Sequence, residues 1–598
     1  MNWIYPEIKA KGKPDYTTLH AHLLHVGEAA RHFAQAMGFD PEIAYIGAIL
    51  HDIGKASPVF QQRLEAKEKP RFPFRHELAS LLFLPCFDEK LHEPLIEMVV
   101  AHHKSIKNDP RRKGILDLEE EHEDVFALHA KGWDDWAPKA VALLQACGVP
   151  LVAAEAPSLD SAEDAYYRVV AYCEKKVKQR GYAKWRGLLM AADHFASALI
   201  DQTSEYVPRT FRAPDLSFYE RQHPLYPLSL ILTNDPRPHT IVVAPTGAGK
   251  TDFLLRRCTG RVFYTLPFQA SINAMYQRIR NDLLPSNPEL DIRILHGSSK
   301  VVVEGGKPVE QVLQPLVGSA VKVLTPHQLA GALFGVNGYE ALLLDLQGCD
   351  VILDEVHTYT GVSQAIVVRI VELLRKLDCR VHIGTATLPT CLYEELLSLL
   401  GSEHTFQVRL PADVLETFNR HTVYKPDPEE IWAIVDQAIA RREKVLVVCN
   451  RVQYAQEMYV QMREHSPDVD ILLLHSRFKR CDRTEKELLL MGMDEQKRPV
   501  HRFNTADGPC IVVSTQVVEV SLDISFDLMI TDCAPIDALI QRFGRINRKR
   551  SEKTIGHYKP VYVLPPPESK NDALPYDLEV LERSYEVLPD GEVLSETT

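Results

Sequence analysis

The sequence predicts a multidomain protein in which an all-α domain is followed by two α/β domains with parallel sheets. Three observations predict this architecture. Apolar residues recur at helical spacing over residues 1–205. From residue 226 onward, short β-branched runs alternate with helical stretches, and this alternation occurs as two series in tandem. The 598 residues suffice for three or four domains of about 150 residues each.

The composition is that of an ordinary globular protein, with 45% hydrophobic and 25% charged residues. No apolar run approaches the roughly 20 residues of a membrane span, and the N-terminal stretch lacks the apolar core of a signal peptide. The 11 cysteines form no CxxC pair, so we expect reduced thiols in a cytoplasmic protein. A net charge of −13 excludes a surface that is basic all over, but a local basic groove could still bind nucleic acid.

The first domain is expected to span residues 1–205. HLLHVGEAARHFAQAMG (22–38) and PEIAYIGAILHDIGK (41–55) each have helical periodicity, and KWRGLLMAADHFASALI (184–200) is expected to be the last helix. The charged stretch 104–138 is expected to be an exposed loop or broken helices. A segment rich in Pro, Arg and aromatics, 206–225, is predicted to be a linker.

Two series of apolar strands predict the two α/β domains. The first is TIVVAP, RVFYTLP, DIRILHG, VKVLTP, DVILDEVH and RVHIGTATLP; the second is KVLVVCN, DILLLHS, CIVVSTQ, DLMITD and PVYVLP. Such strands separated by helices are typical of parallel sheets with both faces covered. We expect the domains at 226–410 and 411–565, followed by a short tail at 566–598.

A glycine-rich loop joins the first of these strands to a helix, in the string VVAPTGAGKT. In that context the glycines let backbone N–H groups approach phosphates at a helix N-terminus. The lysine is expected to reach the β- and γ-phosphates of ATP, and the following hydroxyl to face Mg²⁺. The expected nucleotide-binding residues are Thr246, Gly247, Gly249, Lys250 and Thr251.

Acidic and basic groups complete a predicted ATP-hydrolysing site. Asp354 and Glu355 follow the strand DVIL, at the sheet edge where ligands bind in such folds. We expect Asp354 to hold Mg²⁺ and Glu355 to orient or deprotonate the attacking water. The string QRFGRINR of the second α/β domain carries Gln541, Arg545 and Arg548. Its two arginines are expected to cross the cleft and stabilise the transferring phosphoryl group, which would couple hydrolysis to domain closure.

A second set of chemistry-bearing residues lies in apolar helical segments of the first domain, where a buried histidine needs a partner. An adjacent His-Asp pair can ligate metal with both side chains. The candidate ligands are His22, His51, Asp52, His76, His102, His103 and Asp193. Lys55 is expected to hold the scissile phosphate or help the leaving group. His20 and His25 are predicted to be bystanders, although His25 is near enough to His22 on a helix to approach the site.

GAGKT, DEVH, TAT (385–387) and QRFGRINR, in that order, resemble the motifs of superfamily 2 helicases. The resemblance implies two RecA-like domains. It also implies that Thr385 and Thr387 link the ATP state to nucleic acid, and that Thr515 and Gln516 lie between strand and nucleotide. Two further implied positions are a strand-gripping motif that begins at Asn450 and Arg451, and an adenine-reading glutamine, for which Gln222 is the candidate.

The order His…His-Asp…His…His-His…Asp resembles the HD phosphohydrolase superfamily. This implies one metal held by His22, His51, Asp52 and Asp193, and a second held by Asp52, His76, His102 and His103. A metal pair about 4 Å apart activates water and steadies the leaving oxygen of a phosphodiester. Imidazole-rich ligation suits Fe, Mn, Co or Ni.

An HD domain followed by such a helicase resembles the signature helicase–nuclease of type I CRISPR systems, as do the strings RHELAS, STQVVEVSLDISFD and DCAPIDALIQRFGRINR. The resemblance implies an ATP-dependent helicase, moving 3′ to 5′, that feeds the displaced strand of target DNA to a metal-dependent nuclease in antiviral defence. The implied partners are single-stranded DNA and the RNA-guided Cascade complex, with the free protein a monomer. About 50 residues follow Arg548, so a reduced or missing C-terminal domain is expected.

Two other functions fit the same residues. One is an HD nucleotide phosphohydrolase regulated by a helicase-like module. The other is an ATP-dependent remodelling module whose HD domain only maintains its shape. Assays with nucleotides and with circular single-stranded DNA as substrates would distinguish them.

Overall fold

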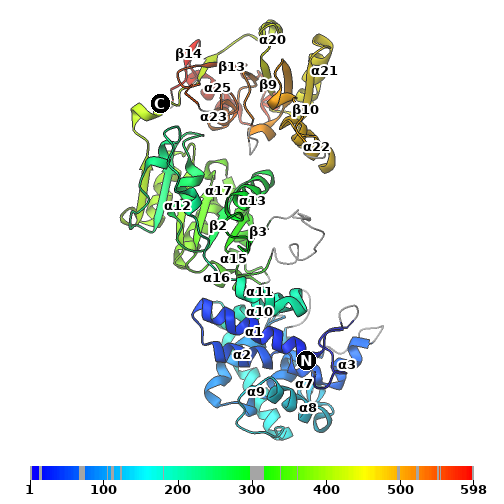
Figure 1. Ribbon diagram of the computed structural model, residues 1–598. Coiled ribbons are helices and arrows are strands. Elements are labelled where there is room, and N and C mark those ends of the chain that lie inside the picture. Colours follow the sequence, from blue (N-terminus) through cyan, green and yellow to red (C-terminus); the bar gives the residue numbers. More distant parts are fainter. Residues whose placement is uncertain are drawn as a thin grey trace.

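Three domains lie end to end in the computed structural model (Figure 1). The structure describes all residues except 1–2, 13–15, 66–73, 104, 109–113, 122–123, 180, 296–314, 337, 360, 495–497, 520–523, 549–550, 553 and 596–598. The all-α domain occupies one end, the first α/β domain the middle and the second α/β domain the other end. This confirms the predicted fold class.

The first domain is a bundle of helices around one hydrophobic core. Its long helix α1 begins after the N-cap Thr18, whose hydroxyl accepts from Ala21 N–H, and ends at Gly38, which has φ +76°. α1 packs against α2 and α10. The helices are α1 (Leu19–Met37), α2 (Pro41–Leu50), α3 (Pro58–Glu65), α4 (His76–Leu81), α5 (His92–Val99), α6 (Ile115–Glu121), α7 (Val125–Ala130), α8 (Trp133–Ala146), α9 (Leu159–Lys176) and α10 (Lys184–Leu199), with the 3₁₀ helix η1 (Ile53–Ala56) after α2.

The first α/β domain contains a seven-stranded parallel sheet of order β3-β4-β2-β5-β6-β1-β7. Separate hydrophobic clusters cover its two faces, as the continuous apolar strands predicted. The strands are β1 (His239–Val243), β2 (Val262–Thr265), β3 (Ile292–Leu295), β4 (Val321–Leu324), β5 (Asp350–Asp354), β6 (Arg380–Thr385) and β7 (Thr405–Arg409). The helices are α12 (Lys250–Arg257), α13 (Gln269–Leu283), α15 (Pro326–Leu333), α16 (Tyr339–Leu346), α17 (Gly361–Lys376) and α18 (Thr390–Leu400).

The second α/β domain contains a sheet of order β10-β11-β9-β12-β13-β8-β14, in which only the pairing of β14 with β8 is antiparallel among the described strands. The strands are β8 (His421–Tyr424), β9 (Lys444–Val448), β10 (Asp470–Leu474), β11 (Cys510–Ser514), β12 (Leu528–Thr531), β13 (Lys559–Val563) and β14 (Glu592–Val593). The helices are α19 (Ala412–Glu416), before β8, and α20 (Ile431–Ala440), α21 (Val452–His465), α22 (Arg480–Leu490), α23 (Ile536–Phe543), α24 (Lys570–Ala573) and α25 (Leu578–Val587).

The segments expected as linker and tail are packed elements. In 206–225, Val207 is buried in the core of the helical domain and Tyr219 in that of the first α/β domain. Leu581 and Leu588, in 566–598, are buried in the core of the second α/β domain. β14 covers the edge of β8, which would otherwise present unpaired backbone groups. The described parts of both segments are therefore packed against the domains.

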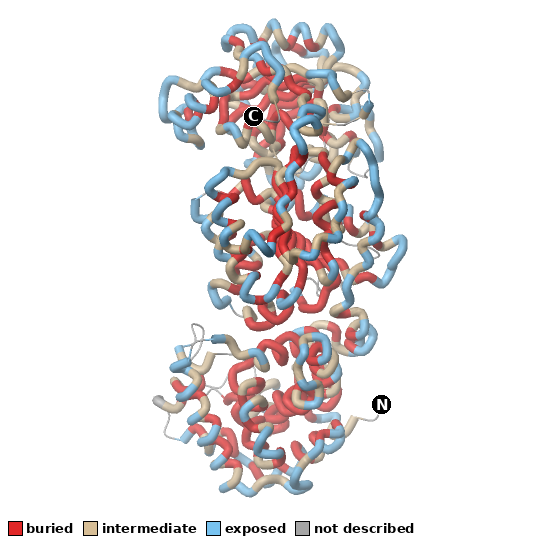
Figure 2. Tube along the Cα trace, turned by 90° about the vertical axis from the view of Figure 1, so that its left-hand side faces the viewer, coloured by how far each residue is buried: buried red, intermediate tan, exposed pale blue. Residues whose placement is uncertain are grey.

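The helical domain is joined directly to the first α/β domain. Helix α10 packs on α16, and at Gly187 an added Cβ would lie 2.9 Å from the backbone carbon of Glu340. Arg186 forms an ion pair with Glu340, and Leu344 of α16 belongs to the core of the helical domain. Figure 2 shows buried residues through the centre of each domain. Helix α10, which carries the candidate ligand Asp193, therefore rests on the first α/β domain.

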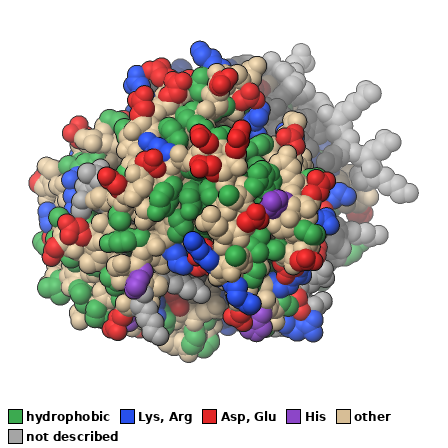
Figure 3. Space-filling model, turned by 90° about the horizontal axis from the view of Figure 1, so that it is seen from above, with side chains coloured by type: hydrophobic (Ala, Val, Ile, Leu, Met, Phe, Trp, Pro, Cys, Tyr) green, Lys and Arg blue, Asp and Glu red, His purple; other side chains and the backbone are tan. Residues whose placement is uncertain are grey.

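Charged residues are distributed rather than segregated at the far end of the second α/β domain. Acidic, basic and apolar side chains are interspersed over that face (Figure 3), in keeping with the overall negative charge. Among the described residues, no helix combines the length and apolar character needed to cross a bilayer.

Candidate metal centre and nucleotide cleft

The seven predicted metal ligands of the helical domain meet in the structure. They form two groups, within each of which the ligand atoms lie within 4.8 Å of one another: Asp52, His76, His102 and His103; and His22, His51 and Asp193. Asp52 lies between the groups. Its Oδ1 is 3.0 Å from His76 Nε2, and its Oδ2 is 3.1 Å from His22 Nε2. One carboxylate oxygen thus faces each group, as a bridging ligand requires.

Five helices and one turn position these side chains. His22 is in α1, His51 and Asp52 lie between α2 and η1, and His76 is the first residue of α4. His102 and His103 follow α5, and Asp193 is in α10. His20 and His25 belong to neither group. His20 Nδ1 instead accepts a hydrogen bond from the Ile4 N–H at 3.2 Å.

Backbone carbonyls fix the orientation of two of the rings. His51 Nδ1 is 2.5 Å from the Ala48 oxygen, and His102 Nδ1 is 2.7 Å from the Val99 oxygen. A carbonyl only accepts, so each Nδ1 carries the proton and each Nε2 presents a lone pair to the centre. Burial and the neighbouring His51 and His76 lower the pKa of His102 to about 4. Burial and His102 do the same for His103, so both are neutral ligands near pH 7.

The electrostatics of the centre favour a cation. Burial alone would raise the pKa of Asp52, but His51, Lys55 and His76 hold it well below its usual range. Hydrogen bonding to Asp193 and Asp52 raises the pKa of His22 despite its burial, which reflects an attraction for positive charge that a metal ion would satisfy.

Several acceptor atoms at the centre are buried without a hydrogen bond. They are His51 Nε2, Asp52 Oδ1, His76 Nε2 and His102 Nε2. His76 Nε2 and Asp52 Oδ1 approach to 3.0 Å without forming one. Buried acceptors are expensive unless something binds them, and convergent imidazole and carboxylate donors are what a transition metal binds. The residues present therefore fit a metal pair.

Two charged residues border this centre. Lys55 forms an ion pair with Asp52, at the position expected for a phosphate-holding group. Glu77 was not predicted, and its Oε2 lies 3.4 Å from His76 Nδ1. Burial would raise the pKa of Glu77, but His76, His102 and His103 lower it to about 2, so this side chain is an anion.

A further cluster, Cys258, Asp350 and His382 in the first α/β domain, has metal-ligand residue types but is already satisfied. Arg380 donates to both oxygens of Asp350 at 2.7 Å, and His382 Nε2 lies 3.0 Å from Asp350 Oδ1. The N–H groups of Thr259 and Gly260 donate to Oδ2. An arginine occupies the place a cation would need, so this is a structural network.

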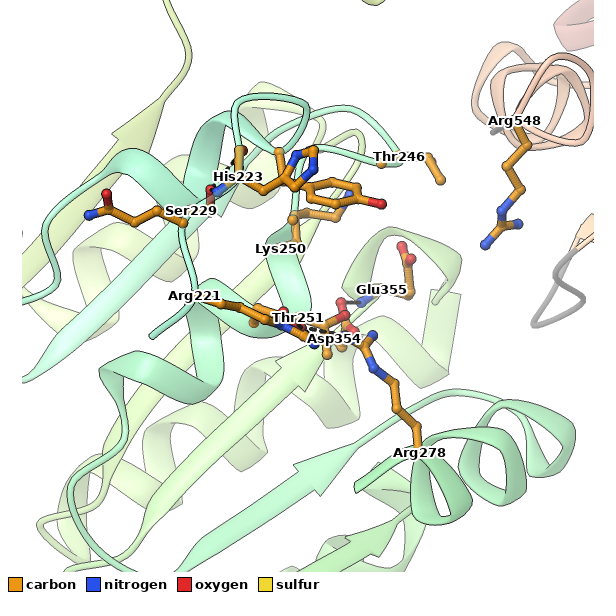
Figure 4. Close-up of a pocket in the computed structure, with 15 residues that line it drawn as sticks. Arg221, His223, Ser229, Thr246, Lys250, Thr251, Arg278, Asp354, Glu355 and Arg548 are labelled. Carbon is orange, nitrogen blue, oxygen red and sulfur yellow. Dashed lines mark hydrogen bonds and ion pairs between the residues drawn. The ribbon is translucent and has the colours of Figure 1, made fainter. Parts of the chain in front are cut away.

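A cleft of about 540 Å³ surrounds the glycine-rich loop (Figure 4). Gly247 and Gly249 have φ of +91° and +93°, which favour glycine, and at Gly249 a Cβ would lie 3.2 Å from Tyr226 Cβ. Lys250 begins α12 and donates to the Ala244 oxygen at 2.8 Å. The residues that line the cleft include Thr246, Gly247, Gly249, Lys250, Thr251, Asp354, Glu355 and Arg548, together with Gln222.

The two acidic residues lie at the carboxyl end of β5, as expected. Tyr264 of β2 donates to Asp354 Oδ2 at 2.6 Å, a support that the sequence analysis did not identify. Burial, together with the charge of Glu355, raises the pKa of Asp354. Glu355 has φ +56°, a strained conformation for a residue with a Cβ, and its side chain reaches the cleft. Arg278, also not predicted, extends toward Asp354 from α13 (Figure 4).

A chain of polar contacts links the two α/β domains. Gln541 contacts His357 Nε2, and His357 Nδ1 is 2.5 Å from the Thr385 hydroxyl. The Thr385 hydroxyl donates to the Thr387 oxygen at 2.5 Å, so it accepts from His357 Nδ1–H. Burial lowers the pKa of His357, which keeps the ring neutral with Nε2 as an acceptor for the Gln541 amide.

The arginines of the second α/β domain have different surroundings. Arg548 lines the cleft and extends toward Glu355 from the opposite side (Figure 4). Arg545 is buried, and its guanidinium donates to the oxygens of Val518 at 2.7 Å and Glu519 at 2.5 Å. It borders the neighbouring part of the cleft, but these bonds hold it against its own domain. In this arrangement Arg548 reaches toward Glu355, and the role expected of Arg545 across the cleft stays a prediction.

The positions expected to contact nucleic acid are only partly exposed. Asn450 is buried, with its side chain donating to the Cys533 oxygen and accepting from Arg542. Gln516 Nε2 donates to the Asn450 oxygen at 2.8 Å. Thr515 is buried, and Arg451 is half-exposed in an ion pair of 2.8 Å with Asp572. Asn450 therefore supports the domain internally rather than presenting its side chain to a strand.

Comparison with known families gives three matches along the chain. Residues 19–127 match the HD domain, residues 228–395 the DEAD/DEAH box helicase family, and residues 441–551 the C-terminal part of the CRISPR-associated nuclease/helicase Cas3. The chain is therefore similar to Cas3 in its last part and carries the HD and helicase matches ahead of it.

Proteins named Cas3 are similar to this chain over much of its length. The Cas3 nuclease/helicase of Methanothermobacter thermautotrophicus is 30% identical over 381 residues, covering 59% of this chain and 44% of that protein. The Cas3 endonuclease/helicase of Thermus thermophilus is 24% identical over 701 residues, covering 94% of this chain and 73% of that protein. The chain thus spans under half the length of the first relative and about three quarters of the second.

Solved Cas3 structures share the fold. The crystal structure of T. fusca Cas3 with AMPPNP has a TM-score of 0.63 and 21% identity, and the match covers 98% of this chain and 79% of that one. A CRISPR RNA-guided surveillance complex in a pre-nicking state contains a chain that matches with a TM-score of 0.55 and 20% identity. At these identities the likeness establishes the fold.

Proposed function

We propose that this chain is an ATP-driven single-stranded DNA translocase and helicase with a metal-dependent DNA nuclease. The observation that carries the proposal is a seven-residue cluster around Asp52, five of whose members are buried, in one chain with a nucleotide cleft whose lining comes from two domains. A nuclease alone needs no such cleft, and a motor alone needs no such cluster. Together they match an enzyme that moves along DNA and cuts it.

The helical domain is proposed to hydrolyse phosphodiester bonds. His22, His51, Asp52 and Asp193 would hold one divalent ion, and Asp52, His76, His102 and His103 a second, with Fe, Mn, Co or Ni favoured by the imidazole donors. Bound metals would supply an activated water and stabilise the leaving oxygen. Lys55, beside Asp52, would bind the scissile phosphate and neutralise charge as the bond breaks.

The α/β domains are proposed to hydrolyse ATP with Mg²⁺. Lys250 and Thr251 would bind the phosphates and the ion, and Glu355 would orient the attacking water. Arg548 would stabilise the transition state from the second domain, so that hydrolysis requires a closed cleft. The contacts from Gln541 through His357 to Thr385 and Thr387 would couple closure of the cleft to binding of the DNA strand. Gln222 is the proposed reader of adenine.

The proposed substrate is the displaced strand of a target DNA opened by an RNA-guided Cascade complex, with the free protein a monomer that moves 3′ to 5′. Binding through phosphates makes such activity tolerant of sequence and sensitive to salt. Specificity would then reside in the guide RNA of the partner complex. The surveillance complex among the structural neighbours supports this choice of partner.

Substrate comparison tests the proposal. The full chain, supplied with Mn²⁺ or Co²⁺, is expected to cut circular single-stranded DNA without ATP, and duplex with a single-stranded flank only when ATP is added. Hydrolysis of free nucleotides with no cutting of DNA would instead favour a nucleotide phosphohydrolase. ATPase activity of the α/β domains, with no cutting of DNA and no hydrolysis of free nucleotides by the helical domain, would favour a remodelling module.

A further inference from the structure

The turn that carries Asp52 is tightly attached to helix α4, which begins with His76. The Ser80 hydroxyl donates to the His51 oxygen at 2.8 Å and accepts from the Gly54 N–H at 2.9 Å. At Gly54 an added Cβ would lie 2.3 Å from the His76 oxygen, so η1 rests directly on the first turn of α4. The backbones of Asp52 and His76 are therefore fixed relative to each other, and rotation of the His76 ring is the remaining freedom.

The start of α4 is also fixed from its other side. The Arg75 N–H donates to His129 Nε2 at 2.9 Å, and His129 Nδ1 lies 2.6 Å from the Val125 oxygen. This makes His129 a neutral acceptor, and Phe74 stacks on its ring. Helix α7 thus anchors the backbone of the residue before His76.

His76 differs from His51 and His102 in what faces its Nδ1. His51 and His102 each donate to a backbone carbonyl. His76 Nδ1 instead lies 3.4 Å from the carboxylate oxygen Oε2 of Glu77, while its Nε2 faces Asp52. A carboxylate can only accept when ionised, so it selects the tautomer with the proton on Nδ1 and the lone pair on Nε2. The distance exceeds an ordinary hydrogen bond by a few tenths of an ångström, so the two groups lie at ion-pair distance.

Glu77 is buried beside two basic groups, the His76 ring and the guanidinium of Arg75. Its side chain is 2% exposed, its Oε1 has no hydrogen-bond partner among the described residues, and Arg75 Nη1 is 3.8 Å away. A buried carboxylate is expensive unless nearby charge compensates it. Asp52 and Asp193 give the centre two negative charges, and two divalent ions would bring four positive ones. A third carboxylate beside His76 reduces that excess.

We propose that Glu77 is a positioning residue for the metal centre, which orients the His76 ring and strengthens metal binding at the group formed by Asp52, His76, His102 and His103. This inference rests on the proposed function, because it requires that the cluster binds metal. Glu77 does not touch the metal or the substrate. It acts through His76 Nδ1 and through its charge.

Cobalt titration of the full chain tests the proposal. Chelator-treated wild type is titrated with Co²⁺, and binding is followed by calorimetry and by the visible absorption of bound cobalt. Glu77→Ala removes both acceptor and charge, and Glu77→Gln retains an acceptor without charge. We expect Glu77→Ala to weaken one of the two binding steps by about 10- to 100-fold and to shift its absorption, with Glu77→Gln in between.

Glu97→Gln is the matched control. Glu97 is a partly buried carboxylate of the same domain that accepts from the Trp185 N–H at 3.1 Å and lies outside both groups of ligands. The Glu97→Gln variant should bind two Co²⁺ ions as wild type does. All variants should keep the DNA-stimulated ATPase activity of wild type, and this activity verifies that they are folded. Two wild-type binding steps in both Glu77 variants would overturn the inference. A wild-type chain that binds no Co²⁺ would overturn the metal centre itself.

Discussion

Arg545 and Arg548 are three residues apart, yet their side chains have different contacts. Arg548 reaches the nucleotide cleft, whereas Arg545 donates to the backbone oxygens of Val518 and Glu519. The difference arises because α23 ends at Phe543 and the chain turns, with Asn547 at φ +50°. A positive φ at Asn547 redirects the next residue toward the first α/β domain.

Substitution of these two arginines should have separable effects. Arg548→Ala is expected to lower kcat for ATP hydrolysis by about 10³-fold, the usual effect of losing a transition-state arginine, and to leave the melting temperature unchanged. Arg545→Ala is expected to lower the melting temperature, because the carbonyls of Val518 and Glu519 lose a charged donor. Steady-state kinetics and calorimetry on both variants measure this. An Arg545→Ala variant with wild-type stability and the larger loss of kcat would reverse the assignment.

Single residues show what the sequence could and could not predict at the two sites. The seven candidate metal ligands could be predicted because each polar group lies in or beside an apolar helical segment, where burial requires a partner. Glu77 was missed because acidic residues are common in the first turn of a helix, where their charge interacts favourably with the helix dipole. Tyr264 was missed because its contact with Asp354 depends on the register of two strands, in which Tyr264 pairs with Ile352.

At the scale of elements, β5 and β6 are joined at their starts by a buried ionic network. Asp350 begins β5 and accepts from Arg380 and His382 of β6 and from the N–H groups of Thr259 and Gly260. Burial would raise the pKa of Asp350, but the hydrogen bonds from Arg380 and His382 hold it well below its usual range. The same strands end at the nucleotide cleft. The network therefore fixes these strands at the ends opposite Asp354 and Glu355.

The first α/β domain should lose stability in acid. The pKa of Asp350 is lower in the folded than in the unfolded state, so its contribution is present above about pH 4 and is lost as the pH falls further. Asp350→Asn is expected to cost roughly 1–3 kcal/mol at neutral pH, by leaving buried donors poorly satisfied, and to flatten this pH dependence. Calorimetric melting of the full chain between pH 7 and pH 3 measures both effects. The exposed Asp413→Asn is the control, and equal pH profiles for Asp350→Asn and wild type would contradict the account.

At the scale of the whole molecule, the helical domain and the first α/β domain are in direct contact. The contact of α10 with α16 places the helix that carries Asp193 on the domain that carries the glycine-rich loop. The sequence predicted the order of domains because strand and helix periodicities are strong. It did not predict the packing of 206–225 and 566–598, because polar and proline-rich composition hides the few apolar residues that attach them.

Helix docking should be needed to pass the strand from motor to nuclease. Gly187→Ala places a Cβ 2.9 Å from Glu340, although alanine favours the helix itself by about 1 kcal/mol. We expect ATP-dependent degradation of flanked duplex to fall several-fold, while ATPase activity and cutting of short single strands persist. Gly331→Ala is the matched control, since its Cβ would meet nothing closer than 3.9 Å. Wild-type degradation by Gly187→Ala would show that the docked interface carries no coupling.

Cutting of circular single-stranded DNA by Asp52→Ala, with DNA-stimulated ATPase measured on the same sample, tests the central claim most directly. Asp52 alone faces both groups of metal ligands, whereas Lys250 lies in the nucleotide cleft. The account predicts that Asp52→Ala abolishes cutting and keeps ATPase, and that Lys250→Ala does the reverse. Wild-type cutting by Asp52→Ala would contradict the assignment of the metal centre as the nuclease.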